Sequence, residues 1–226
     1  MRTPFIQPDN ALQAPHDPHA SRARLLLWVC FAITAAAGLL SQGVYHEDDL
    51  KHFLYARWSQ HDVRYLLDTW GRPGFTVPYS IPAMIGSPAV GFHACRLLSA
   101  GLSAATAWLV YLIARRYRLR HAWLAIPLVY LQPLFTHLSL TTLTETPLAF
   151  YFALATWLLL TGRCRVSAAV IAIAPLTRHE AVALLPIWAF ALWRFRAHLA
   201  AYPLLLWAMA AHNLAGAVWL NDLPIK

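Results

Sequence analysis

The sequence predicts an all-α, polytopic membrane protein, and three observations lead to this class. Of the 226 residues, 59% are hydrophobic and only 12% are charged, about half the charged share of an ordinary soluble domain. The apolar residues are grouped in runs, several of them near the roughly 20 residues with which a helix crosses a bilayer. The formal net charge of +8 is spread between these runs, as in loops that set membrane orientation. A soluble enzyme is excluded, and nucleic acid is not expected as a partner.

About seven apolar runs are expected to span the membrane as one helix bundle. A polar segment, residues 1–21, precedes them, and we expect it to be a disordered cytoplasmic tail. Residues 22–226 then form a single transmembrane domain. The expected spans cover residues 25–44, 92–114, 121–140, 146–162, 166–176, 179–193 and 199–219.

Residues 45–91 form the first loop on the outer side, the longest polar interruption of the hydrophobic body. Apolar residues recur at helical spacing from Leu50 to Trp58, which predicts an amphipathic helix lying at the membrane surface. Pro73 and Gly74 then redirect the chain into the membrane. We therefore expect this loop to consist of interfacial helices.

The distribution of charge predicts the orientation of the chain. With a cytoplasmic N-terminus and alternating spans, every short cytoplasmic turn is basic and none carries a carboxylate, in agreement with the positive-inside rule. The carboxylates outside the tail all face the opposite side: Glu47, Asp48, Asp49, Asp62, Asp68, Glu145, Glu180 and Asp222. Because ionisable groups at a membrane are costly and usually mark a site, we expect the chemistry on the outer face.

Glu47, Asp48 and Asp49 are the strongest candidate catalytic residues. Adjacent carboxylates can activate a hydroxyl as a general base or coordinate a cation. They also fit a structural interpretation, because acidic residues stabilise the first turn of a helix through its dipole. Spacing alone leaves both interpretations open, and it does not decide which acid would be the base.

Two arginines on the expected outer face are candidates for binding a phosphate. Arg72 follows Trp70 and Gly71, and it fits both a phosphate ligand and an interfacial anchor. Arg178 adjoins membrane-embedded sequence, where a permanent charge requires an anionic partner. Either Glu145 or a substrate phosphate would serve.

Three neighbours of these arginines complete the candidate substrate-binding set. Glu145 follows Thr142, and Glu180 follows Thr177, at the spacing of a capping box. Both acids therefore also fit a purely structural role. His179, beside Arg178, fits an isolated interfacial histidine, since no histidine spacing in the chain demands a metal site.

The order of these motifs resembles that of the GT-C superfamily of integral-membrane glycosyltransferases. A single span is followed by the segments HEDDLKHFLYAR and WGRPGF, and later by TETPLAFYFALATWLL and LTRHEAVALLPIWAFAL. The superfamily includes protein O-mannosyltransferases, aminoarabinose transferases and related bacterial enzymes that use polyprenyl-phosphate sugars. The resemblance covers about residues 22–222 and rests on motif order and topology.

The resemblance implies a function and a role for each matched residue. It implies inverting transfer of a sugar from a polyprenyl-phosphate donor to a lipid, glycan or protein acceptor, at the outer face of a bacterial-type inner membrane. Asp48 matches the base of the family, with Asp49 as its partner and Glu47 as the alternative. Arg178 matches the arginine near the lipid phosphate, and Arg72 is a weaker match. No cofactor is required, although the carboxylates could hold a divalent cation.

Other interpretations stay open at this stage. The chain is much shorter than the usual family member, so we expect it to be truncated at its C-terminal end, and an inactive transferase remnant is one alternative. A transporter or flippase-like protein is another, because charged residues among spans can form a substrate path. The gathering of charge at one interface and the lack of inverted symmetry favour the transferase.

Overall fold

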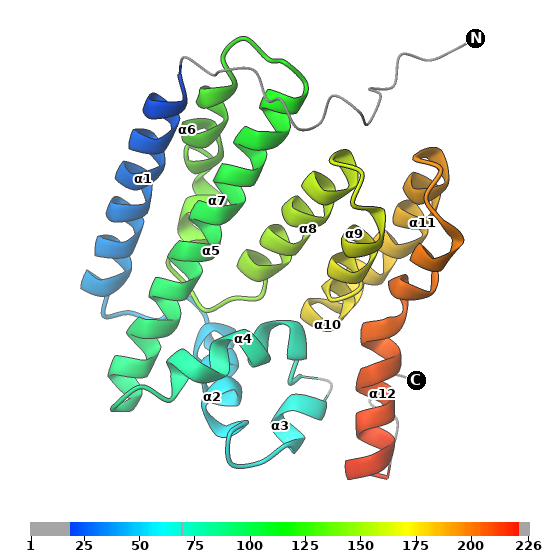
Figure 1. Ribbon diagram of the computed structural model, residues 1–226. Helices are drawn as coiled ribbons and strands as arrows, with labels where there is room; N and C mark the ends of the chain where they lie inside the picture. The colour runs from blue at the N-terminus through cyan, green and yellow to red at the C-terminus, as the bar shows by residue number, and fades with distance from the viewer. Residues whose placement is uncertain (1–18, 69, 222–226) are drawn as a thin grey trace.

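The computed structural model describes residues 19–68 and 70–221, and it confirms the all-α class. The fold is 77% helix, and the described residues contain no strand. Figure 1 shows the longer helices running between two ends of the molecule, with the short helices α2, α3 and α4 gathered at one end. Asp222 and all but the last three residues of the expected tail lie outside the described residues.

Two helices are long and apolar enough to cross a membrane, α1 (Ala20–Leu40) and α5 (Pro88–Arg116). At 1.5 Å per residue they extend about 31 and 43 Å, compared with about 30 Å for a hydrocarbon core. α1 begins inside the expected tail and ends four residues before the predicted boundary at residue 44. The Ser87 side chain caps the N-terminus of α5, and Arg115 and Arg116 lie in its last turn, where positive charge is stabilising.

The other expected spans consist of shorter helical pieces. The label η marks a short 3₁₀ helix. In chain order the pieces are η2 (Ala122–Leu124), α6 (Ala125–Tyr130), α7 (Pro133–Leu138), α8 (Glu145–Leu160), α9 (Cys164–Ile171), α10 (Ala174–Thr177), η3 (His179–Ala183), α11 (Leu184–Arg194), η4 (Leu199–Ala201), η5 (Pro203–Leu205) and α12 (Trp207–Trp219). Pro133, Pro175 and Pro203 each lie at the start of a piece. Because proline lacks the N–H that continues a helix, these positions divide runs that look continuous by hydrophobicity.

The outer loop expected at residues 45–91 forms three helices, α2 (Glu47–Trp58), α3 (Arg64–Leu67) and α4 (Pro73–Ala83), together with the start of α5. One face of α2 packs against α4 and α5 in a buried cluster made of Phe53, Ala56, Phe75, Tyr79, Ala83 and Cys95. Phe53, part of the apolar stripe expected at the membrane surface, therefore faces the protein core. Leu50 and Trp58, from the same stripe, are 42% and 43% exposed.

One end of the helix assembly is strongly basic, and the other end holds the carboxylates. The turns after α5, α8 and α11 lie at the end away from α2–α4 (Figure 1) and hold Arg118, Arg120, Arg163 and Arg196, and Arg165 follows in the first turn of α9. All carboxylates of the described residues lie at the other end: Glu47, Asp48, Asp49, Asp62, Asp68, Glu145 and Glu180. The segregation of charge expected from the sequence is therefore present in the folded chain.

Candidate functional site

Asp49 is fully buried and engaged on both carboxylate oxygens. One oxygen accepts a hydrogen bond from the backbone N–H of Thr142 at 2.6 Å and another from the Thr142 hydroxyl. The second oxygen accepts from the backbone N–H of Tyr45 at 3.3 Å and lies 3.8 Å from the guanidinium of Arg96. These contacts fix the first turn of α2 against α5 and the loop before α8. The geometry therefore gives Asp49 a structural role.

Arg96 of α5 is a structural residue that the sequence interpretation did not single out. It is 3% exposed and donates to the backbone carbonyl of Ser41 at 2.6 Å and to that of Gly43, just after α1. A cation at this position also complements the negative C-terminal end of the α1 dipole. The sequence did carry a signal, because an arginine inside the expected span 92–114 must find a buried anion.

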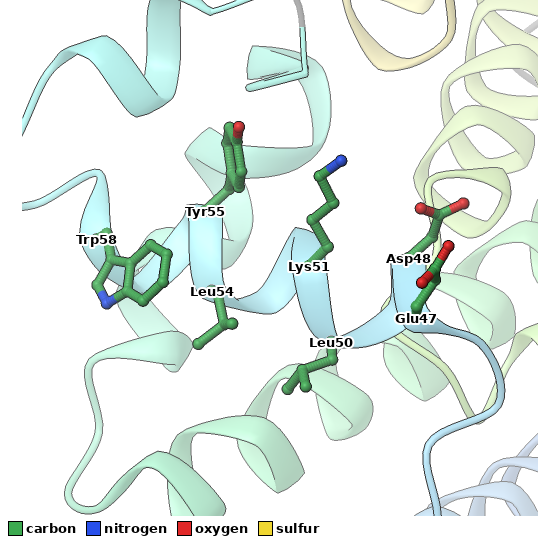
Figure 2. Close-up of a pocket in the computed structure, with 7 residues that line it drawn as sticks. All are labelled: Glu47, Asp48, Leu50, Lys51, Leu54, Tyr55 and Trp58. Carbon is green, nitrogen blue, oxygen red and sulfur yellow. The ribbon is translucent and has the colours of Figure 1, made fainter.

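Unlike Asp49, Asp48 remains accessible. Its side chain is 39% exposed and lies 3.5 Å from Nδ1 of His46. His46 itself caps α2, since its Nδ1 accepts a hydrogen bond from the backbone N–H of Asp48 at 3.2 Å. The helix start is thus capped by His46, and Asp48 is not needed for that role. Glu47 is exposed beside Asp48 (Figure 2).

Neither of the two expected capping boxes is formed. Thr142 turns towards α2, and the Thr177 hydroxyl donates to a carbonyl of its own helix. Thr142 has thus exchanged a local cap for the buried Asp49 carboxylate, and Thr177 bonds the carbonyl of Ile173 one turn earlier. Glu145 instead forms an ion pair with Arg178, and Glu180 lies 3.5 Å from the Nε of Arg178.

Arg72 and Arg178 approach one another at the end of the molecule that carries α2–α4. Arg72 precedes α4 with a left-handed backbone (φ 41°) and donates to the Thr144 hydroxyl at 3.1 Å. Its Nε is buried and has no hydrogen-bond partner among the described residues. Burial and then the charge of Arg178 lower the pKa of Arg72, while nearby carboxylates, Asp48 among them, act in the opposite direction. Two arginines from distant segments thus share one small region.

His52 lies one helical turn after Asp48, so both side chains are on the same face of α2. The imidazole is 3% exposed and packs against Phe75 with the ring centroids 5.3 Å apart. Its Nδ1 is buried without a hydrogen-bond partner in the described chain. Burial, followed by the charge of Arg72, lowers the pKa of His52 to about 4, so the ring is neutral near pH 7. The sequence interpretation treated it as an isolated interfacial histidine.

A glycine allows α4 and α10 to approach closely enough to bring the two arginines together. A Cβ at Gly74 would overlap the Thr177 hydroxyl and would lie 3.0 Å from both the carbonyl oxygen of Ile173 and the backbone nitrogen of Thr177. Two of these atoms belong to the backbone and cannot rotate away. Any larger residue at position 74 must therefore push α4 off α10, and Arg72 moves with it.

Gly74→Ala is expected to lower the free energy of unfolding by about 1–3 kcal/mol, the usual effect of overpacking a close contact. The measurement is thermal unfolding of the full chain in detergent. Gly101→Ala is the matched control, because a Cβ at Gly101 of α5 meets nothing within 4 Å and alanine favours a helix more than glycine does. Equal stability of the Gly74 and Gly101 variants would contradict the close approach.

The structure thus brings most of the sequence-predicted site residues into one electrostatic cluster and leaves three outside it. The cluster consists of Asp48, Arg72, Glu145, Arg178 and Glu180, with His52 added by the structure. Asp49 is buried in the separate network that it forms with Thr142 and Arg96, and Glu47 is exposed beside Asp48. His179 is also exposed, and its electrostatic neighbour is His212 of α12.

A groove of about 340 Å³ lies along the exposed face of α2. Figure 2 shows Glu47 and Asp48 at one end, Trp58 at the other, and Lys51 and Tyr55 along one side. Lys51 places its Nζ 3.9 Å from the centre of the Trp70 ring, and the Arg72 guanidinium lies 5.3 Å from the same ring. The groove therefore opens beside the cluster, with Asp48 belonging to both.

No protein-family model, curated protein or solved structure matches the chain. In residues 19–68 and 70–221, no group of three or more His, Cys, Asp or Glu side chains is placed to hold a metal ion. The cluster offers two guanidinium groups that can bind an anion, an accessible carboxylate, Asp48, outside the ion pairs of Arg178, and a neutral buried imidazole.

Proposed function

We propose that the chain is a membrane glycosyltransferase of the GT-C kind, transferring a sugar from a polyprenyl-phosphate donor to an acceptor hydroxyl. The observation that carries this proposal is the convergence of three distant segments on residues 142–145: Arg72 donates to Thr144, Arg178 pairs with Glu145, and the helix turn that holds Asp48 is bonded to Thr142 through Asp49. In the proposed topology the chain has seven spans and a cytoplasmic N-terminus. The site then faces the outer side of a bacterial-type inner membrane.

The surface of α1 supports a membrane environment. Its large apolar side chains are exposed, including Leu25 at 65%, Trp28 at 65% and Ile33 at 64%. Soluble monomers rarely expose continuous apolar patches of this kind, whereas a bilayer would cover them. The surplus of arginine at the end of the assembly away from α2–α4 supports the proposed orientation through the positive-inside rule.

The arginines supply the positive charge that binding of a lipid-phosphate donor requires. The phosphate carries negative charge before transfer, and more when it leaves, so fixed cations at this position stabilise the transition state. Arg72 has a free donor in its buried Nε. Arg178 is held by Glu145 and Glu180, and it would exchange one carboxylate for a phosphate oxygen, since guanidinium binds both with the same geometry.

Asp48 is the proposed base. The oxygen of the acceptor hydroxyl attacks the anomeric carbon while its proton passes to the Asp48 carboxylate. The bond between the anomeric carbon and the phosphate oxygen breaks, and its electron pair stays on the phosphate. A single displacement of this kind inverts the anomeric centre and yields polyprenyl phosphate. The 39% exposure of the Asp48 side chain leaves it accessible to an acceptor.

The test is release of undecaprenyl phosphate by the full chain in vesicles. The donors are undecaprenyl-phosphate-linked hexoses and pentoses, and the acceptors are a whole-membrane extract. We expect release with at least one donor, and its loss in Arg178→Gln. Arg64→Gln is the control, because Arg64 is an exposed partner of Asp62 outside the cluster.

Two outcomes would overturn the proposal. Failure of the wild-type chain to release undecaprenyl phosphate from every donor would favour the inactive remnant. Movement of an intact labelled donor across the vesicle bilayer, without cleavage, would favour the transporter.

A further inference from the structure

Two neighbouring polar groups in the cluster are buried without partners. His52 Nδ1 and Arg72 Nε both lack a hydrogen bond within the described residues. His52 is only 3% exposed. The two groups come from different elements, α2 and the turn before α4. Both lie where α2 meets the start of α4, because Phe75, which packs on the His52 ring, donates its backbone N–H to the carbonyl of Arg72. A buried polar group without a partner is costly, so two of them at one contact mark a place where a ligand would supply the missing partners.

The charges around His52 select the kind of ligand. The cations that influence it are Arg72, Lys51 and Arg178, and Asp48 is the carboxylate that does so. Burial, and then this excess of positive charge, lowers the pKa of His52 and keeps the imidazole neutral. The same excess favours an anion with several acceptor oxygens, and a neutral imidazole still has one N–H to donate.

The packing of His52 holds its ring in a fixed orientation. The α2 backbone sets its position, and Phe75 of α4 lies against the ring. A donor whose rotamer is already fixed loses little entropy when it binds. Tyr79 stacks on Phe75 with the ring centroids 4.0 Å apart, so the support beneath the imidazole is itself buried and rigid.

We propose that His52 is a third phosphate-binding side chain, donating a ring N–H to the phosphate group that Arg72 and Arg178 contact. This inference rests on the proposed function and deepens it, because it adds a neutral donor from the helix that carries the proposed base. The same face of α2 would then hold both reaction partners, with Asp48 at the acceptor hydroxyl and His52 at the leaving phosphate.

The test measures binding of radiolabelled undecaprenyl phosphate to the full chain in detergent, without any transfer step. His52→Asn places an amide near the position of Nδ1, His52→Gln places one near Nε2, and His52→Phe keeps the ring but removes both nitrogens. We expect His52→Phe to weaken binding by about tenfold, the effect of losing one hydrogen bond to a charged group. We expect one of the two amide variants to retain binding close to that of the wild type.

The unliganded stability of the variants separates binding from packing. His52→Phe should be at least as stable as the wild type, because it removes an unpartnered polar atom and preserves the contact with Phe75. His61→Phe, at an exposed histidine after α2, is the matched control and should change neither property. Unchanged binding in His52→Phe would overturn the inference, as would a loss of binding that is matched by a loss of stability.

Two further binding measurements identify the source of the phosphate. Undecaprenol tests binding without phosphate, and it should bind wild type and His52→Phe equally. Competition by inorganic phosphate that depends on His52 would assign the site to phosphate in general, and its absence would assign the site to the lipid-linked form. Wild-type binding without transfer activity would contradict the proposed function alone, whereas lack of wild-type binding would overturn the inference.

Discussion

Asp49→Ala is expected to reduce the free energy of unfolding by about 3–5 kcal/mol, the effect of removing one partner of a buried ion pair. The variant leaves the Arg96 guanidinium, 3% exposed, without its carboxylate. It also removes the acceptor of the Thr142 backbone N–H. Unfolding of the full chain in detergent, followed by helical circular dichroism, measures the loss.

Two further variants show whether the loss arises from the unpaired charge. The double variant Asp49→Leu with Arg96→Met replaces the pair by apolar side chains and should recover part of the stability. Recovery should be incomplete, because the bonds from Arg96 to the carbonyls of Ser41 and Gly43 are also lost. Asp62→Ala is the surface control, and an equal effect of Asp49→Ala and Asp62→Ala would contradict the buried network.

Asp48→Asn is expected to lower the rate of sugar transfer by about 10²–10⁴-fold at saturating donor, the usual contribution of a general base. The amide has nearly the same shape as the carboxylate but cannot accept the proton. Stability should change little, because the Asp48 side chain is 39% exposed. The measurement is the initial rate of undecaprenyl phosphate release in vesicles.

Asp62→Asn is the matched control for Asp48→Asn. Asp62 lies at the same end of the molecule but pairs with exposed Arg64, so its variant should transfer at the wild-type rate. A wild-type rate in Asp48→Asn would refute the proposed base. If Glu47→Gln then lost activity, the role would pass to Glu47, which is exposed beside Asp48.

The helical class and the distribution of charge could be predicted from the sequence, because both depend on the order of residue types along the chain. The apolar excess predicted the helical class, and the order of basic turns and carboxylates predicted that the acidic residues would gather at one end of the folded chain. Two helices long enough to span a membrane are found, α1 and α5. The remaining runs are divided into shorter pieces, because their hydrophobicity does not show how proline and local turns interrupt the backbone.

The roles of neighbouring residues were decided only by the tertiary structure. Asp48 and Asp49 are adjacent in the sequence, but successive side chains of a helix point about 100° apart. Packing of α2 against α5 therefore buries Asp49 against Arg96 and leaves Asp48 accessible. The packing of α2 against α4 buries His52 against Phe75. The sequence by itself determined that a group of acids lies beside a membrane-sized helix, and the packing partner of each helix face determined which acid holds the fold and which stays accessible.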